Sequence, residues 1–143
     1  AGGVEAATVG DVQQAGVFGG VYYTDPTTSK PTWKAYYPAS TAAADIVATI
    51  YMDPDIVFEA QHDETGTAAL NFASGNFVGT GGSTTTGQST QELDTSTFTT
   101  TASGLKQIGI SKDPDNSDTS TANCNAYVVF NQEEHVFTFA TGI

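Results

Sequence analysis

Apolar and polar residues alternate in short runs along most of this chain, which predicts β-strands separated by turns. The alternation is clearest in residues 32–38, 45–54, 55–63 and 104–114, where side chains two positions apart share a face. Three Asp-Pro pairs and several Gly- or Asn-rich stretches stop these runs, as turns do. Outside 39–50 the chain shows no sustained helical period. We therefore predict one all-β domain, a β-sandwich or β-barrel of about eight to ten short strands.

Several local features follow from this pattern. The run GVFGGVYYT (16–24) is rich in β-formers, and its glycines Gly16, Gly19 and Gly20 indicate a bulge or a close backbone approach. Residues 25–31 have the composition of a hairpin loop. Residues 45–63 predict a strand, a turn at Asp53-Pro54 and a second strand. The last two strands are expected near 126–131 and 134–140.

The domain organisation is simple. Residues 1–15 are small and polar and predict an N-terminal arm or the remnant of an upstream strand region, and residues 16–143 form the all-β domain. The Gly/Thr-rich stretch at 79–90 predicts a long loop of the kind that often serves binding. From the alternation we expect six core or near-core residues: Ile46, Ile50, Phe58, Ile108, Val128 and Phe130.

Charge limits the classes of partner. The chain has 16 carboxylates against four lysines, for a net charge of −12, and it has no arginine. A phosphate backbone would repel such a chain, so direct nucleic-acid binding is excluded, and binding to anionic membranes is disfavoured. No apolar run has the length of a membrane span. The acidity also suits a basic partner, whose contacts would weaken in salt.

The residues that usually carry chemistry are sparse. Cys124 is the single cysteine, so it forms no disulfide within the chain, and its setting indicates a small residue at a turn. His62 and His135 each sit beside carboxylates in a strand, where an ordinary surface position is expected. No nucleophile, phosphate-binding or zinc motif is present. We therefore predict a protein that is not an enzyme and needs no cofactor.

One segment resembles the opening of a calcium loop. Asp113, Asp115 and Asp118 have the spacing of the first ligands, and they are the candidate Ca²⁺ residues. The glycine expected at the sixth place is absent, and Cys124 stands where the bidentate glutamate would be. The same residues also form an ordinary turn, which is the interpretation that we favour.

Five aromatic residues cluster between positions 22 and 37: Tyr22, Tyr23, Trp33, Tyr36 and Tyr37. Exposed rings of this kind form stacking platforms in carbohydrate-binding modules, and they are also enriched in cores and interfaces. Alternation places Trp33 and Tyr37 on one face of the strand and Tyr36 on the other. We interpret the cluster as part core and part interface.

Four longer segments share their order and spacing with a known family: GVFGGVYYTDPTTSKPTWKAYYP (16–38), ATIYMDPDIVFEAQ (48–61), LDTSTFTTTASGLKQIGISKDPDN (93–116) and NAYVVFNQEEH (125–135). They resemble virion structural proteins of tailed bacteriophages of the marine and cyanophage type. The chain departs from the family pattern at Gly19-Gly20, at Met52 and in LKQIGI. The resemblance covers most of residues 16–135.

The resemblance implies a capsid decoration (cement) protein on the outer surface of the virion head, with the major capsid protein as its partner. It carries over no catalytic residues. Two alternatives stay open: another virion or surface component, such as a head fibre base, tail or filament subunit, and a carbohydrate-binding β-sandwich. The Gly/Thr loop, the arm and the aromatic residues also predict a homo-oligomer, a trimer rather than a dimer.

Overall fold

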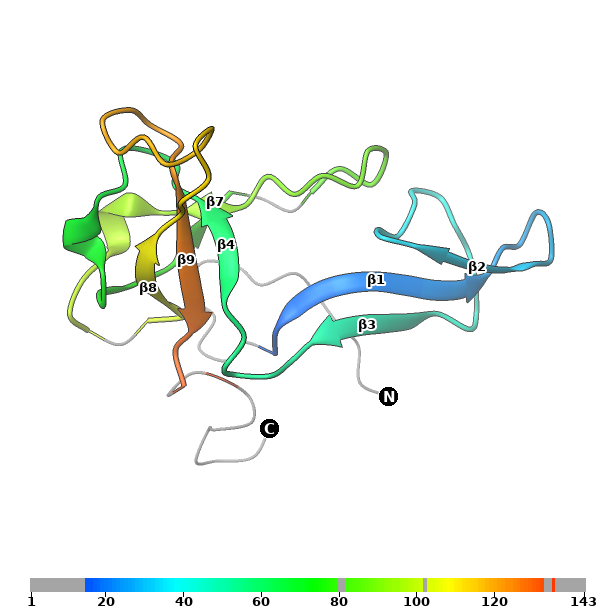
Figure 1. The fold of residues 1–143 in the computed structure, drawn as a ribbon. Coiled ribbons are helices and arrows are strands. Elements are labelled where there is room, and N and C mark those ends of the chain that lie inside the picture. Colours follow the sequence, from blue (N-terminus) through cyan, green and yellow to red (C-terminus); the bar gives the residue numbers. More distant parts are fainter. Residues whose placement is uncertain (1–14, 80–81, 102, 133–134, 136–143) are drawn as a thin grey trace.

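The computed structural model describes residues 15–79, 82–101, 103–132 and 135 (Figure 1). These residues hold nine β-strands, two short 3₁₀ helices and no α-helix, which confirms the all-β prediction. The strands form three antiparallel sheets, and no sheet of the described part closes into a barrel. The predicted arm (1–15) and the predicted strand at 134–140 fall almost wholly outside the described residues.

The first sheet has the order β2-β1-β3, built from β1 (Val17–Thr24), β2 (Pro31–Lys34) and β3 (Val47–Tyr51). The β1–β2 hairpin turns at Asp25, whose side chain accepts hydrogen bonds from the backbone N–H groups of Thr27 (2.7 Å) and Thr28 (3.1 Å). This turn confirms the predicted hairpin loop. We call residues 15–51 the wing, because Figure 1 shows this sheet projecting from the rest of the molecule.

A β-bulge interrupts β1 at the predicted glycines. The register with β3 shifts between Phe18 and Gly20, so Gly19 is the extra residue. Gly20 has a φ of 134°, and a Cβ atom there would lie 2.8 Å from Cζ2 of Trp33. Glycine is needed at this position both for its backbone conformation and because the indole ring lies against it.

The remainder of the described chain, residues 52–132, is the body. Its main sheet has the order β4-β9-β8-β5, and a two-stranded sheet pairs β6 with β7. The elements are β4 (Phe58–Gln61), η1 (Ala68–Leu70), β5 (Ser74–Gly75), β6 (Phe77–Val78), β7 (Glu92–Leu93), η2 (Thr95–Thr97), β8 (Leu105–Ile110) and β9 (Asn125–Phe130). Both strands predicted in 45–63 form, but β3 pairs with β1 whereas β4 pairs with β9. The chain therefore passes from wing to body at Asp53-Pro54.

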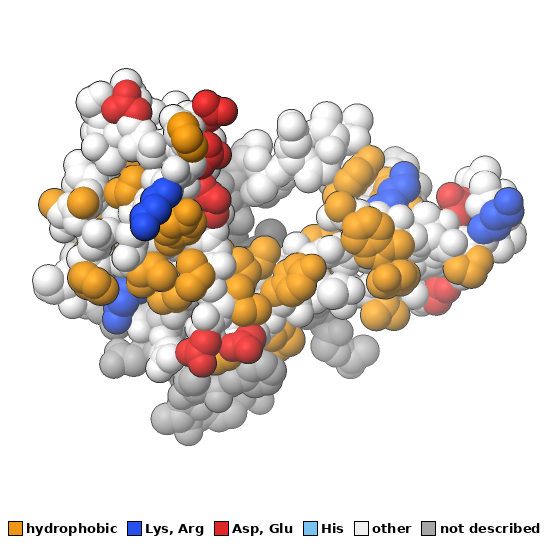
Figure 2. Space-filling model, viewed as in Figure 1, with side chains coloured by type: hydrophobic (Ala, Val, Ile, Leu, Met, Phe, Trp, Pro, Cys, Tyr) orange, Lys and Arg blue, Asp and Glu red, His pale blue; other side chains and the backbone are white. Residues whose placement is uncertain are grey.

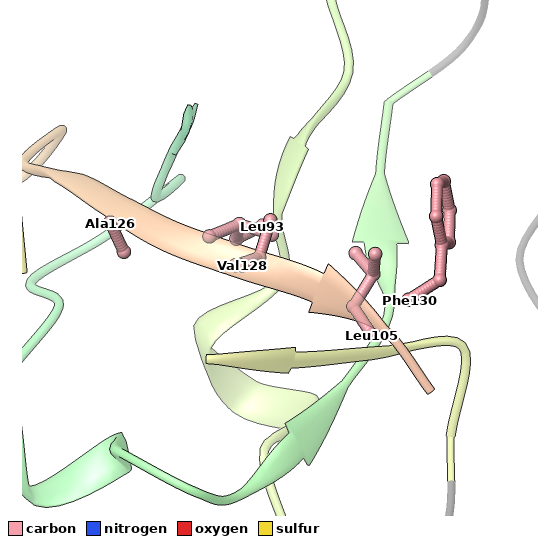
Figure 3. Packing of buried hydrophobic residues seen from close by; sticks show 5 residues of the cluster. All are labelled: Leu93, Leu105, Ala126, Val128 and Phe130. Atoms are coloured by element: carbon pink, nitrogen blue, oxygen red, sulfur yellow. The ribbon is translucent and has the colours of Figure 1, made fainter. Parts of the chain in front are cut away.

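The hydrophobic core lies in the body. Its buried residues line β9 and the strands beside it (Figure 3): Leu93, Leu105, Ala126, Val128 and Phe130. Val128 and Phe130 confirm two of the predicted core positions, and Phe58 packs against the cluster from β4. The aromatic rings of Phe58 and Phe130 meet edge to face at 5.4 Å.

The other predicted core positions need correction. Ile46 is 46% exposed, because it lies in the wing, away from this core. Ile108 is only half-buried, because alternation along β8 places it on the face opposite the buried Leu105 and Gln107. It is also the extra residue of a second bulge, between Gln107 and Gly109. Ile50 is also half-buried, since it too lies in the wing.

The bulge of β1 gives a testable prediction. We expect Gly20→Ala to lower the free energy of unfolding by about 1–3 kcal/mol, because the new methyl group combines an unfavourable φ with a clash against Trp33. Gly109→Ala is the matched control, since its Cβ would lie 3.8 Å from the nearest heavy atom of the Tyr127 side chain. Urea denaturation measures both variants. Equal stability of the two would show that the Gly20 conformation is not required.

Candidate docking surface

One face of the wing carries five exposed apolar side chains. Cross-strand register places Tyr22 of β1 between Trp33 of β2 and Val47 of β3, and places Val17 opposite Tyr51. Residues two apart on β3 share a face, so Val47 and Tyr51 lie on the same side. The exposed fractions of the five side chains run from 36% to 61%. We call this surface the open face.

The opposite face of the wing is partly covered. Val21 and Tyr23 are buried there, and the ring of Tyr37 packs edge to face on Tyr23 with centroids 5.8 Å apart. The 35–46 connection is anchored by Asp45, whose carboxylate accepts hydrogen bonds from the Thr24 hydroxyl (2.6 Å) and backbone N–H (3.0 Å). These hydrogen bonds hold the pKa of Asp45 below its ordinary value, and the bond from the Thr24 hydroxyl has the larger effect.

The Gly/Thr-rich stretch reaches from the body to the wing. Its tip folds back on itself, with Ser83 N–H donating to Gln88 O at 2.8 Å. The Tyr36 hydroxyl donates to Thr85 O (3.2 Å), and the Tyr36 ring lies against Gly87. Figure 1 shows this loop extending alongside the wing. The loop predicted for binding thus contacts the wing of its own chain.

The predicted aromatic cluster divides between the two faces. Tyr22 and Trp33 lie on the open face, whereas Tyr23 is buried and packs with Tyr37. Trp33 and Tyr37 were expected to share a face, but β2 ends at Lys34 and the alternation stops there. The cluster is therefore partly buried and partly exposed, and an interface role for its members stays a prediction.

Charge is distributed unevenly between wing and body. The wing holds two aspartates and two lysines, a net charge of zero, whereas the body holds ten carboxylates against two lysines, a net charge of −8. In the view of Figure 2, hydrophobic side chains follow the wing, and most of the acidic side chains lie on the body. The open face is therefore an apolar surface on the neutral part of an acidic protein.

One further exposed aromatic side chain lies on the body. Phe72 is 76% exposed and has a φ of 68°, which is rare for a bulky residue. It follows η1, which Figure 1 shows at the end of the body away from the wing. Phe72 is thus an exposed aromatic residue separate from the open face.

Both histidines are buried, which corrects the expected surface positions. His62 contacts Gln107 Oε1 through Nε2 (2.9 Å) and Thr95 Oγ1 through Nδ1 (3.1 Å). Gln107 Nε2 donates to Thr67 O (3.0 Å) and Asn71 Oδ1 (2.9 Å), so its Oε1 must accept from His62. Nε2 of His62 therefore carries a proton. His135 packs against Phe130 with ring centroids 5.9 Å apart.

This polar cluster ties the 62–71 segment to β8 and η2. Burial lowers the pKa of His62, although the hydrogen bond to Gln107 and the charge of Asp63 act in the opposite direction. The buried Cys124 thiol donates to Gly66 O at 3.4 Å in the same region. Because its side chains bond one another inside the body, we interpret the cluster as structural.

The structure does not bring the calcium candidates together. Asp113 accepts from the N–H of Asp115 (3.1 Å), and Asp118 accepts from the N–H (2.8 Å) and hydroxyl (2.6 Å) of Ser120. These are local turn contacts. Among the described residues, no group of three or more His, Cys, Asp or Glu side chains is placed to hold a metal ion.

Comparisons with known proteins add no relative. No family model, no curated protein and no solved structure matches the chain. The described part of the fold contains no helix long and apolar enough to cross a membrane. The resemblance to phage virion proteins therefore stays a prediction from sequence.

The buried histidine predicts a pH dependence of stability. Folding lowers the pKa of His62 below its ordinary value of 6.5, so the unfolded chain binds the proton more tightly. The contribution of His62 to the free energy of unfolding is fully present above pH 6.5. It falls as the pH drops below that value, by at most about 1.4 kcal/mol per pH unit. Urea denaturation between about pH 5 and pH 7 measures this slope. In His62→Gln the slope should flatten, and an unchanged slope would show that another group causes it.

The aspartate turns predict indifference to calcium. Since Asp113 and Asp118 already accept hydrogen bonds from their own turns, we expect no stoichiometric Ca²⁺ in the purified protein. Thermal unfolding with and without a chelator measures this. A fall in the unfolding midpoint on chelation, reversed by added Ca²⁺, would contradict the prediction.

Proposed function

We propose that this chain is a non-enzymatic virion protein that decorates a phage capsid, binding its outer surface and stabilising the lattice through the open face of the wing. The resemblance of four ordered segments to tailed-phage virion proteins supports the class. The observation that carries the docking role is the open face itself, five exposed apolar side chains on a sheet over which the described residues place no second layer.

The size of the open face supports an interaction role. A fully covered Tyr or Trp buries about 150–250 Å². Three half-exposed rings and two valines therefore present roughly 400–500 Å² of apolar surface. Contiguous patches of this size on soluble proteins commonly mark interaction sites. Repetition across a lattice would let a modest affinity per copy stabilise the whole shell.

The charge distribution supports the same proposal. The open face can be desolvated against a partner without burying charge, which is costly, because its five side chains are uncharged. The acidic body can at the same time lie beside basic groups of the major capsid protein. Contacts between these acidic and basic groups steer association and weaken as the salt concentration rises. Apolar contacts do not weaken with salt. Binding to heads should accordingly fall with salt only in part.

The composition of the open face favours a protein partner over a carbohydrate. Tyr22 and Trp33 are tilted by 55°, with centroids 6.4 Å apart, so they form no flat stacking platform. Val17 and Val47 share the surface and give it an aliphatic part. Mixed aliphatic and aromatic surfaces of this kind are typical of interface cores. A head fibre base, tail or filament subunit would use the same surface at another place on the particle.

Binding to phage heads tests the proposal. We expect the double variant Trp33→Ser/Tyr51→Ser to lose at least about tenfold in affinity for heads assembled without the protein, because aromatic anchors dominate interface energy. Sedimentation of heads with increasing protein measures this affinity. Val47→Lys provides a second disruption, at a side chain that is 61% exposed.

Phe72→Asn is the matched control, since it removes an exposed aromatic residue from the body and asparagine tolerates a positive φ. It should bind as the unmodified protein does. Circular dichroism confirms that each variant is folded. Failure of the unmodified protein to sediment with heads would overturn the capsid role, and normal binding of both wing variants would overturn the docking surface.

A further inference from the structure

The two edges of the wing sheet differ in how well they are protected. Half of the backbone N–H and C=O groups of an edge strand point away from the sheet, and native proteins block such edges with lysine, proline or a covering segment. On β2 the edge is blocked in this way, because the strand begins at Pro31 and carries Lys34, with Lys30 just before it.

The outer edge of β3 carries no such protection. The segment Ile46–Met52 (IVATIYM) contains no charge and no proline. Its β-branched and aromatic residues match the composition of segments that pair readily with another strand. Among the described residues, β3 pairs with β1 alone, and no backbone bond to its outer edge is present. Within the part of the chain that the structure describes, an uncharged strand of five residues is thus open at the side of the wing.

We propose that the outer edge of β3 binds β3 of a second copy of this chain, in an antiparallel pair with a two-fold axis at Thr49. This inference goes beyond the proposed function, because pairing of two copies requires no capsid. It joins the two wings into one six-stranded sheet, β2-β1-β3 continuing into β3-β1-β2 of the second copy.

The strand is complementary to itself in this register. With Thr49 opposite Thr49, each Val47 faces Tyr51 of the second copy, and each Ala48 faces Ile50. Pairs of aromatic with β-branched residues are among the favourable cross-strand pairs. Val47 and Tyr51 lie on the open face, so the open faces of the two copies would join into one apolar surface of twice the area.

Charge also favours a second copy at this edge. In Figure 1, β3 runs toward the body, so an antiparallel partner places its own body at the opposite end of the joined sheet. The two neutral wings meet, and the two bodies, each with a net charge of −8, lie far apart. Two-fold pairing leaves neither copy with an unpaired outer edge on β3, so this geometry favours a dimer over the trimer expected from the sequence.

Opposite charges introduced at the axis test the pairing directly. Thr49 is exposed on β3, so Thr49→Lys places two lysines opposite each other only in the dimer, and Thr49→Glu does the same with carboxylates. We expect each variant alone to associate roughly five- to twentyfold more weakly than the unmodified chain. A mixture of the two variants should recover the affinity of the unmodified chain to within about twofold, as a mixed dimer.

Sedimentation equilibrium of the purified full chain from micromolar to millimolar concentration measures these constants. Thr32→Lys, on the protected edge strand β2, is the matched control and should leave the dimer intact. Because the bodies are acidic, dimerisation should strengthen as salt rises. This trend is opposite to that expected for acidic contacts with a basic capsid, so the two associations can be told apart.

A monomer at every concentration would overturn the inference while leaving the capsid role open. The inference would also be overturned if the mixture of Thr49→Lys and Thr49→Glu failed to recover the affinity of the unmodified chain, because the two copies would then associate through another surface. Heads that protect the β3 amides from hydrogen exchange, with no dimer in solution, would instead assign this edge to a strand of the capsid protein. If the chain forms the dimer but does not bind heads, the proposed function is overturned and the dimer inference stands.

Discussion

The arrangement of this protein depends on a general constraint, that an apolar sheet face has to be buried against another layer. The body satisfies the constraint by itself, since Leu93, Leu105 and Val128 are enclosed among its own strands. The wing satisfies it only in part, on the face where Tyr37 covers Tyr23 and where Phe18 is still 43% exposed. Its open face and the outer edge of β3 have no cover within the described chain, and we propose that association covers both.

The wing is held in place before any partner arrives. The turn at Asp25, the bond between Asp45 and Thr24, and the contact of Tyr36 with the 82–88 loop each fix part of it. Binding therefore needs little ordering of the docking element, which raises the affinity obtained from a limited area. The separation of charge is consistent with the proposed function, in which the acidic body would favour solubility and the neutral wing would make the contact.

Local features of the fold were accessible from the sequence because they depend on neighbouring residues. The hairpin at Asp25-Pro26, the bulge at Gly19-Gly20 and the buried alternation of Val128 and Phe130 all follow from short patterns. Long-range pairing was not accessible. An Asp-Pro turn shows where β3 ends but not that β4 joins a different sheet. Alternation along β8 likewise does not show that the face of Leu105 and Gln107, and not that of Ile108, is buried. The position of His62 depends on Thr95 and Gln107, which only the tertiary fold brings to its ring.

Whether association covers the open face can be measured by residue-resolved hydroxyl-radical footprinting. The protein would be oxidised free at high dilution and bound to heads, and the modified side chains identified by mass spectrometry. We expect strong protection of Tyr22, Trp33 and Tyr51 on heads, with Phe72 equally reactive in both states. Equal oxidation of the three wing residues in free and bound protein would contradict it.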